Sequence, residues 1–199
     1  LQPGDALTLF NGQGGEWAAE VLSMGRKEVS VRVTAALPVD PPRELALHVT
    51  LAIGMPANER MDALVEKATE LGAAALQPLH CARSVLRLSG ERADKRRAHW
   101  QGVAVAASEQ SGRTQVPMVA PVNDLARWLA GLAPVNATTN ATAEADGVAG
   151  ELRGMLSLAP DAQPLGVLLD TRATNTAPST TPANKPLTHI TLLSGPEGG

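Results

Sequence analysis

The spacing of hydrophobic and polar positions changes along the chain, and the first part carries the spacing of β-strands. Apolar residues dominate segments 6–10 and 17–22, and residues 29–33 alternate apolar and polar side chains with a period of two. Asn11-Gly12 follows the first segment, and this dipeptide favours a tight hairpin turn. We therefore predict three short strands that build a small β-barrel or sandwich.

From Leu45 onward, strand-like runs alternate with helical spacing. Residues 47–53 form an apolar run that predicts a strand. A helix with one apolar face is predicted next, from the spacing of Met61, Leu64, Val65, Ala68 and Leu71. A longer helix is predicted over about 91–110, and further strands are predicted at 75–79, 115–120, 165–170 and 188–193. This alternation indicates the α/β class, with a mostly parallel sheet covered by helices.

The same patterns divide the chain into two domains. A cluster of prolines between residues 38 and 42 marks a linker, which separates a domain at 1–37 from a domain at 45–199. Two stretches of low complexity, near 133–147 and 171–186, interrupt the second domain, and we expect them to be solvated insertions.

Composition narrows the class of protein. Of the 199 residues, 44% are hydrophobic and 19% are charged, which supports a packed core and argues against wholesale disorder. No stretch approaches the ~18–20 consecutive apolar residues of a transmembrane helix, and the first residues have neither the basic start nor the long apolar run of a signal peptide. Cys81 is the single cysteine and the histidines lack metal-ligand spacing, so we predict no disulfide framework and no metal. These features predict a soluble cytoplasmic protein. Because the chain starts without Met and stops within a glycine-rich segment, we expect a fragment that lacks both natural ends.

Charge and aromatic content exclude two kinds of RNA-binding protein. The net charge is −3 and the pI about 5.8, so the protein is not coated in basic charge. Aromatic residues make up 2% of the chain and tyrosine is absent, which argues against an RRM that stacks bases on several aromatic rings.

One basic segment stands out against this acidic background. Six cations against Glu91 and Asp94 leave a local charge of +4; they are Arg83, Arg87, Arg92, Lys95, Arg96 and Arg97. Such a segment fits contact with a phosphate backbone. A solvated helix face with ion pairs explains it equally well.

A glycine-rich segment follows the last predicted strand. It consists of Ser194, Gly195, Pro196, Glu197, Gly198 and Gly199. Open α/β sheets bind ligands at such strand ends, although this segment is neither a P-loop nor a dinucleotide-binding turn. From composition alone, a ligand loop and a simple glycine turn are equally good interpretations.

The end of the long predicted helix holds a second candidate site, the segment Glu109-Gln110-Ser111-Gly112-Arg113. We expect Gly112 to end the helix and Arg113 to project from the loop, where it would pair with a phosphate or an anionic base. A cation that complements the helix dipole is the simpler interpretation on chemistry alone.

Taken in order, these motifs resemble one family, the ribosomal RNA small subunit methyltransferase E family. The segments that carry the resemblance are Gly4-Asp5, Leu9–Gly12, Glu59–Met61, Lys67–Gly72, Arg83–Val85, Glu109–Arg113, Val116-Pro117 and Gly195–Gly199. The resemblance implies a homodimeric enzyme that methylates N3 of a uridine in 16S ribosomal RNA, within the small ribosomal subunit, using S-adenosyl-L-methionine (SAM). It also implies a PUA-like β-barrel followed by an α/β-knot (SPOUT) domain, and it places the segment that completes the knot beyond Gly199.

The resemblance also implies roles for individual residues. The cofactor pocket would include Gly195, Pro196, Glu197, Gly198 and Gly199, with Leu169 and Leu193 as lining residues at strand ends. Glu109 and Arg113 would lie near the substrate as catalytic residues: Arg113 stabilises the uracil anion, and Glu109 acts as general base or holds Arg113. The charge of the basic segment, and not the resemblance, predicts phosphate contacts at Arg83, Arg87, Lys95, Arg96 and Arg97. Two rivals remain: a related SPOUT enzyme that methylates a ribose 2′-OH, and a non-catalytic RNA-binding assembly factor.

Overall fold

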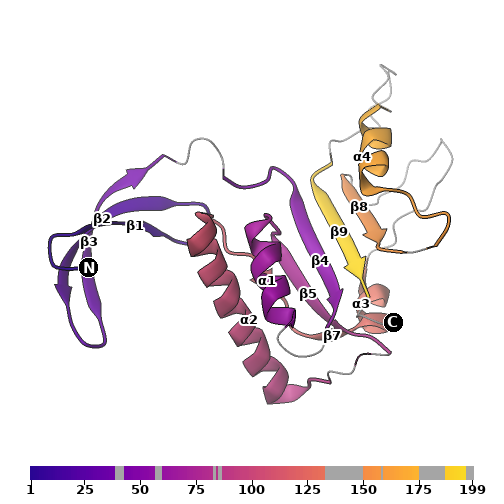
Figure 1. Ribbon diagram of the computed structural model, residues 1–199, viewed down its shortest axis with the longest axis horizontal. Coiled ribbons are helices and arrows are strands. Elements are labelled where there is room, and N and C mark those ends of the chain that lie inside the picture. The colour runs from indigo at the N-terminus through magenta and orange to yellow at the C-terminus, as the bar shows by residue number, and fades with distance from the viewer. Residues whose placement is uncertain are drawn as a thin grey trace.

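The computed structural model contains two β-sheets, one antiparallel and one parallel, and helices packed on the parallel one (Figure 1). The structure describes residues 1–38, 43–56, 60–82, 84, 87–132, 150–157, 159–174 and 187–195, with the backbone alone for 170–174. The predicted insertion at 133–147 lies outside these residues, as do positions 175–186 of the second insertion.

The N-terminal sheet confirms the three predicted strands. They run antiparallel in the order β1-β2-β3, with bounds Ala6–Phe10, Glu16–Met24 and Val29–Leu37. The Asn11 side chain stabilises the first turn, because its Oδ1 accepts hydrogen bonds from the backbone N–H groups of Gln13 and Gly15. Within the described residues these strands form an open sheet of three strands.

The second sheet is parallel throughout, which confirms the α/β class. Its main strands lie in the order β6-β5-β4-β9-β8, and β7 also pairs with β5. The bounds are β4 His48–Gly54, β5 Ala75–His80, β6 Met118–Val119, β7 Asn123–Asp124, β8 Glu151–Met155 and β9 His189–Ser194. Strand β4 lies in the centre, with β5 on one side and β9 on the other.

Two helices, α1 (Arg60–Glu70) and α2 (Gly90–Ser111), pack side by side against this sheet (Figure 1). Their apolar faces and the sheet form one core that includes Met61, Val65, Leu76, Trp100, Ala104 and Val119. Leu71, predicted on the buried face of α1, is instead 80% exposed. It lies beyond the last residue of the helix, where Gly72 with φ of 95° turns the chain away from the core.

One predicted strand is wrong. Residues 165–170 belong to a helix, α4 (Leu165–Thr174), and the strand beside β9 is β8. A short apolar run fits a strand or a helix equally well by periodicity. The backbone N–H of Leu168 donates to the carbonyl of Pro164, so the residue before the run starts the helical pattern.

A further short helix was not predicted. This helix, α3 (Leu125–Gly131), begins at Asp124, whose carboxylate accepts hydrogen bonds from the N–H groups of Ala126 and Arg127.

The two ends of α2 lie near opposite edges of the parallel sheet. Strand β5 ends at His80, and α2 begins ten residues later, so its first turns lie toward the carboxyl edge of the sheet (Figure 1). The helix has 22 residues and therefore runs about 33 Å back toward the amino edge and the N-terminal sheet. Residues at the two ends of α2 belong to different surfaces of the molecule.

Candidate functional site

The glycine-rich segment begins at the carboxyl edge of the parallel sheet, where the sequence predicted it. Ser194, the last residue of β9, is in register with Ile53 of β4, and Gly195 follows directly. Among the described residues, a Cβ added to Gly195 would meet no atom within 4 Å, so the described part of the protein leaves open space there. Open α/β sheets bind ligands at this edge. Of the predicted cofactor loop, Pro196, Glu197, Gly198 and Gly199 lie outside the described residues.

The two leucines predicted to line the cofactor pocket have different positions. Leu193 is half-buried on β9 and packs against the small cluster that contains Ala52 and Leu79. Leu169 lies within α4, so its assignment as a strand-end residue is wrong. The positional argument for a cofactor contact therefore holds for Leu193 and no longer for Leu169.

Arg113 does not project into solvent, which corrects the prediction from the sequence. Gly112 ends α2 in the left-handed conformation with φ of 70°, as predicted, but the Arg113 side chain that follows is only 6% exposed. Its Nη1 donates to the carbonyls of Thr69 (2.9 Å) and Ala73 (2.8 Å), at the end of α1. Its Nε and Nη2 both donate to Oε2 of Glu44, at 2.9 and 2.5 Å. All three nitrogens of the guanidinium thus donate hydrogen bonds to acceptors of the protein itself.

Glu44 completes this buried network, and no motif in the sequence indicated a role for it. Its Oε1 accepts hydrogen bonds from the backbone N–H groups of Thr114 and Gln115, both at 2.9 Å. Burial by itself raises the pKa of this carboxyl group. The hydrogen bonds and charge of Arg113, together with the two backbone N–H groups, outweigh burial and hold the pKa below its ordinary value of 4.5. Glu44 is therefore ionised at neutral pH and bonded on both oxygens.

The lowered pKa of Glu44 predicts a pH-dependent contribution to stability. A carboxylate with a depressed folded-state pKa stabilises the protein above its unfolded pKa, and this contribution is lost as pH falls through the folded value. The difference in unfolding free energy between wild type and Glu44→Gln should therefore be large at pH 7 and shrink steadily below about pH 4.5. Urea titrations between pH 7 and pH 3 measure it. A difference that is the same across this range contradicts the charged network.

Glu109 occupies a different environment from Arg113. It is exposed on the last turns of α2, and no hydrogen bond or ion pair engages its carboxylate among the described residues. It lines a cavity of about 360 Å³ between the N-terminal sheet and the end of α2. The other lining residues are Thr8, Leu9, Phe10, Glu16, Gly112 and Arg113.

The two predicted parts of the active site are not brought together within one chain. Arg113 bonds to Ala73, which precedes β5, and to Glu44, which precedes β4, so it lies at the amino edge of the sheet. Gly195 lies at the carboxyl edge. Glu109 and Arg113 are thus separated from the glycine-rich segment by the length of the strands.

The basic segment divides into paired and unpaired cations. Arg87 donates to the carbonyl of Ala82, Lys95 pairs with Glu91 at 2.9 Å, and Arg97 turns inward to the carbonyl of Val119. Arg83 lies outside the described residues.

Arg92 and Arg96 are the unpaired members. They are exposed one helical turn apart on α2 and engage no partner among the described residues. Both lie toward the carboxyl edge of the sheet, the edge that carries Gly195.

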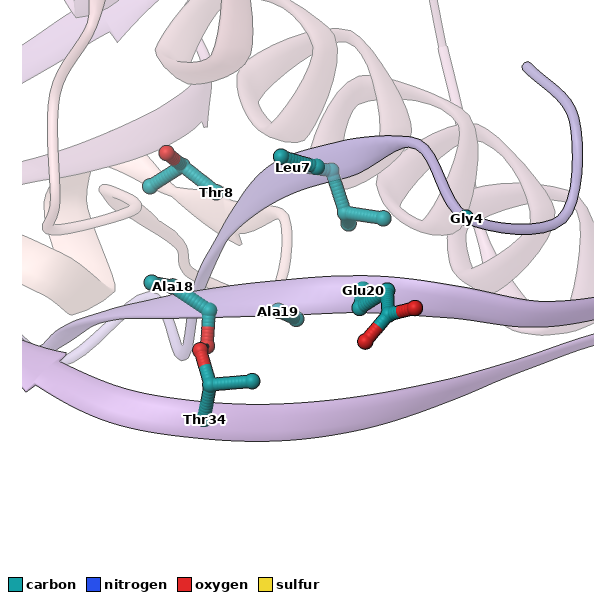
Figure 2. Close-up of a pocket in the computed structure, with 8 residues that line it drawn as sticks. Gly4, Leu7, Thr8, Ala18, Ala19, Glu20 and Thr34 are labelled. Carbon is teal, nitrogen blue, oxygen red and sulfur yellow. The ribbon is translucent and has the colours of Figure 1, made fainter.

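A second hollow crosses the N-terminal sheet, and its described lining carries no positive charge that would attract RNA. It has a volume of about 460 Å³ and is lined by residues of all three strands (Figure 2). Glu20 is the single charged group among its described lining residues, and Thr34 there donates to the Ala18 carbonyl. We assign it no ligand.

The described residues contain neither a membrane-spanning helix nor a cluster of metal-binding side chains. No helix there is long and apolar enough to span a membrane, and no group of three His, Cys, Asp or Glu side chains converges there to hold a metal.

Comparison with known protein families shows to which family the chain belongs. Residues 43–199 match the RNA methyltransferase domain family, and residues 1–34 match the RNA methyltransferase PUA domain. The chain belongs to the RNA methyltransferase domain family. The gap between the two matches, residues 35–42, includes the proline cluster at 38–42.

Similar proteins support the same relationship. Ribosomal RNA small subunit methyltransferase E of Bacillus subtilis is 34% identical over 129 residues, which are 65% of this chain and 50% of that protein. Its namesake from Synechocystis is 35% identical over 120 residues, 60% of this chain and 37% of that protein. The chain therefore spans half or less of the length of these relatives.

Solved structures share the fold. The methyltransferase E of Neisseria gonorrhoeae, bound to S-adenosyl methionine, superposes with a TM-score of 0.76 at 28% identity, over the whole of this chain and 69% of that one. A Legionella pneumophila methyltransferase in complex with SAM gives a TM-score of 0.71 at 26% identity, over 100% of this chain and 68% of that one.

Proposed function

We propose that this protein is a SAM-dependent methyltransferase that acts on N3 of a uridine in 16S ribosomal RNA. One observation carries the proposal: the whole chain superposes on a methyltransferase E bound to SAM. The position of its glycine-rich segment, at the edge of the sheet where open α/β sheets bind ligands, supports it. The open space beside Gly195 and the half-buried Leu193 fit a cofactor held against backbone and apolar surface.

For this reaction the protein has to position the base beside SAM and to remove the proton from N3. SAM supplies an electrophilic methyl group, so no metal is required. Uracil N3 carries a proton that must leave before the nitrogen becomes nucleophilic, and the target base must have this edge unpaired. Glu109 is the exposed carboxylate in the motif that the sequence singled out, and we propose it as the general base.

Glu109 reaches a methyl donor held at Gly195 only if a second copy of the chain supplies it, because the two residues lie at opposite edges of one chain's sheet. We therefore propose a homodimer in which the C-terminal end of α2 in one protomer faces the carboxyl edge of the sheet, with its bound cofactor, in the other protomer. Light scattering of the whole protein measures the oligomeric state. A monomer that is fully active removes Glu109 from the chemistry.

Product analysis tests the reaction. The whole protein is incubated with deproteinised 16S ribosomal RNA and isotopically labelled SAM, and the RNA is digested to nucleosides for mass spectrometry. We expect the label in 3-methyluridine. Label in a 2′-O-methylated nucleoside indicates the related ribose methyltransferase instead. A protein that binds RNA but not SAM is the non-catalytic assembly factor.

RNA binding near the cofactor edge is assigned to Arg92 and Arg96, the exposed and unpaired members of the basic segment. Replacing both with alanine should reduce the slope of log affinity against log salt by ~0.7–0.9 for each lost phosphate contact. Replacing Arg97, which bonds to the Val119 carbonyl, should leave the slope unchanged. Filter-binding titrations at several salt concentrations measure both slopes. An unchanged slope in the double variant makes this segment a solvated helix face.

A further inference from the structure

Arg43 and Glu44 are adjacent residues of the inter-domain segment, which follows the proline cluster at 38–42, and together they contact both domains. The Arg43 side chain reaches the N-terminal sheet, where Nη1 donates to Oε1 of Glu16 on β2 at 2.7 Å. The same nitrogen donates to the carbonyl of Gly112 at the end of α2, at 3.2 Å. Glu16 is 10% exposed on its side chain, so Arg43 is the cation that compensates a nearly buried carboxylate.

Glu44, the next residue, holds the α/β domain. Its carboxylate accepts four hydrogen bonds, two from the Arg113 guanidinium and two from the backbone N–H groups of Thr114 and Gln115. The pair Arg43-Glu44 therefore attaches the inter-domain segment to the N-terminal sheet on one side and to the loop after α2 on the other.

The loop after α2 also bonds directly to the first turn of the N-terminal sheet. The Gly14 N–H donates to the Thr114 carbonyl, and the Val116 N–H donates to the Gly12 carbonyl, both at 3.0 Å. These two bonds run in opposite directions around an antiparallel bridge between Gln13 and Gln115. Glu44 orders this same loop from its other side, so the two sets of contacts support each other.

We propose that Arg43-Glu44, together with Glu16 and Arg113, forms an inter-domain clamp that fixes the N-terminal sheet on the α/β domain, with Arg43 as a positioning residue for the RNA substrate. The inference rests on the proposed function, because it assumes an RNA that contacts both domains. A fixed arrangement presents one continuous surface, whereas freely moving domains would have to be ordered each time RNA binds.

The first test needs no activity. Hydrogen exchange of the whole protein reports the amides of Gly14 and Val116, whose bonds cross between the domains. In Arg43→Ala, and separately in Glu16→Gln, we expect protection at both amides to fall about tenfold, the typical effect of losing a charge-assisted hydrogen bond. Protection of the α1 and α2 amides should stay unchanged, which shows an intact α/β domain. Wild-type protection at Gly14 and Val116 in both variants overturns the clamp.

The second test separates positioning from simple RNA contact. In steady-state methylation, Arg43→Ala should raise KM for the RNA about tenfold and leave kcat and the SAM dissociation constant unchanged. Glu16→Gln should raise KM similarly, although it removes a negative charge. A direct contact between Arg43 and a phosphate predicts the opposite, a KM that is lower or unchanged in Glu16→Gln, and that result overturns the proposal.

Arg32→Ala is the matched control. It removes an equal charge from the N-terminal sheet that Arg43 contacts, and the Arg32 side chain is exposed at 4.0 Å from Glu20. The clamp predicts wild-type KM and wild-type amide protection for this variant, and a KM rise equal to that of Arg43→Ala overturns it. If the wild-type protein methylates no RNA while Arg43→Ala still loses protection, the proposed function fails and the clamp stands.

Discussion

Replacing Arg113 with alanine should lower the free energy of unfolding by about 3–5 kcal/mol, the usual cost of removing one partner of a buried ion pair. The substitution leaves the Glu44 carboxylate without its cation in a nearly buried position. It also removes the donors to the Thr69 and Ala73 carbonyls at the end of α1. Urea unfolding of the whole protein measures the loss.

Two further variants make this prediction specific. Arg113→Lys should recover only part of the stability, because an ammonium group cannot reproduce the planar fork that reaches Glu44 and two carbonyls together. Lys67→Ala removes a cation from an exposed pair with Glu66 and Glu70, and we expect it to leave the free energy of unfolding close to the wild-type value.

A catalytic role for Arg113 predicts a different outcome. If its guanidinium stabilised a uracil anion, Arg113→Ala would keep wild-type stability and lose about 10²–10³ in the single-turnover rate. That combination would contradict the structural role seen in the hydrogen bonds.

Gly195→Val should weaken SAM binding by about ten- to hundredfold, the cost of forcing a β-branched side chain into a filled contact. In the protein alone, a Cβ at this position meets no atom within 4 Å, so the melting temperature should stay at the wild-type value. Loss of affinity without loss of stability would therefore come from the ligand. Calorimetric titration with SAM and a thermal scan measure the two quantities.

Gly102→Val is the matched control for this experiment. Gly102 lies on the exposed face of α2, where an added Cβ also meets no atom within 4 Å. This variant should bind SAM as the wild type does. Wild-type affinity in Gly195→Val as well would remove the glycine-rich segment from the cofactor site.

Periodicity predicted most of the secondary structure because the burial of one face constrains local sequence. The spacing from Met61 to Ala68 and around Trp100 predicted α1 and α2, and the strands at β4, β5 and β9 also appeared where their apolar runs lie. The segment at 165–170 failed because its short apolar run carries no period that separates a strand from a helix.

The sequence by itself determined that Gly112 ends α2, since a residue that adopts positive φ after a helical segment stops it whatever surrounds it. It likewise determined that a glycine-rich segment follows a buried parallel strand at the carboxyl edge. Only the tertiary structure decided where the Arg113 side chain goes. Its partner Glu44 is 69 residues away, in a segment whose sequence predicts only a linker. No local sequence pattern indicates a contact between residues so far apart. The folded chain places this cation against a carboxylate and two helix-end carbonyls, because a buried guanidinium is stable only when its donors are satisfied.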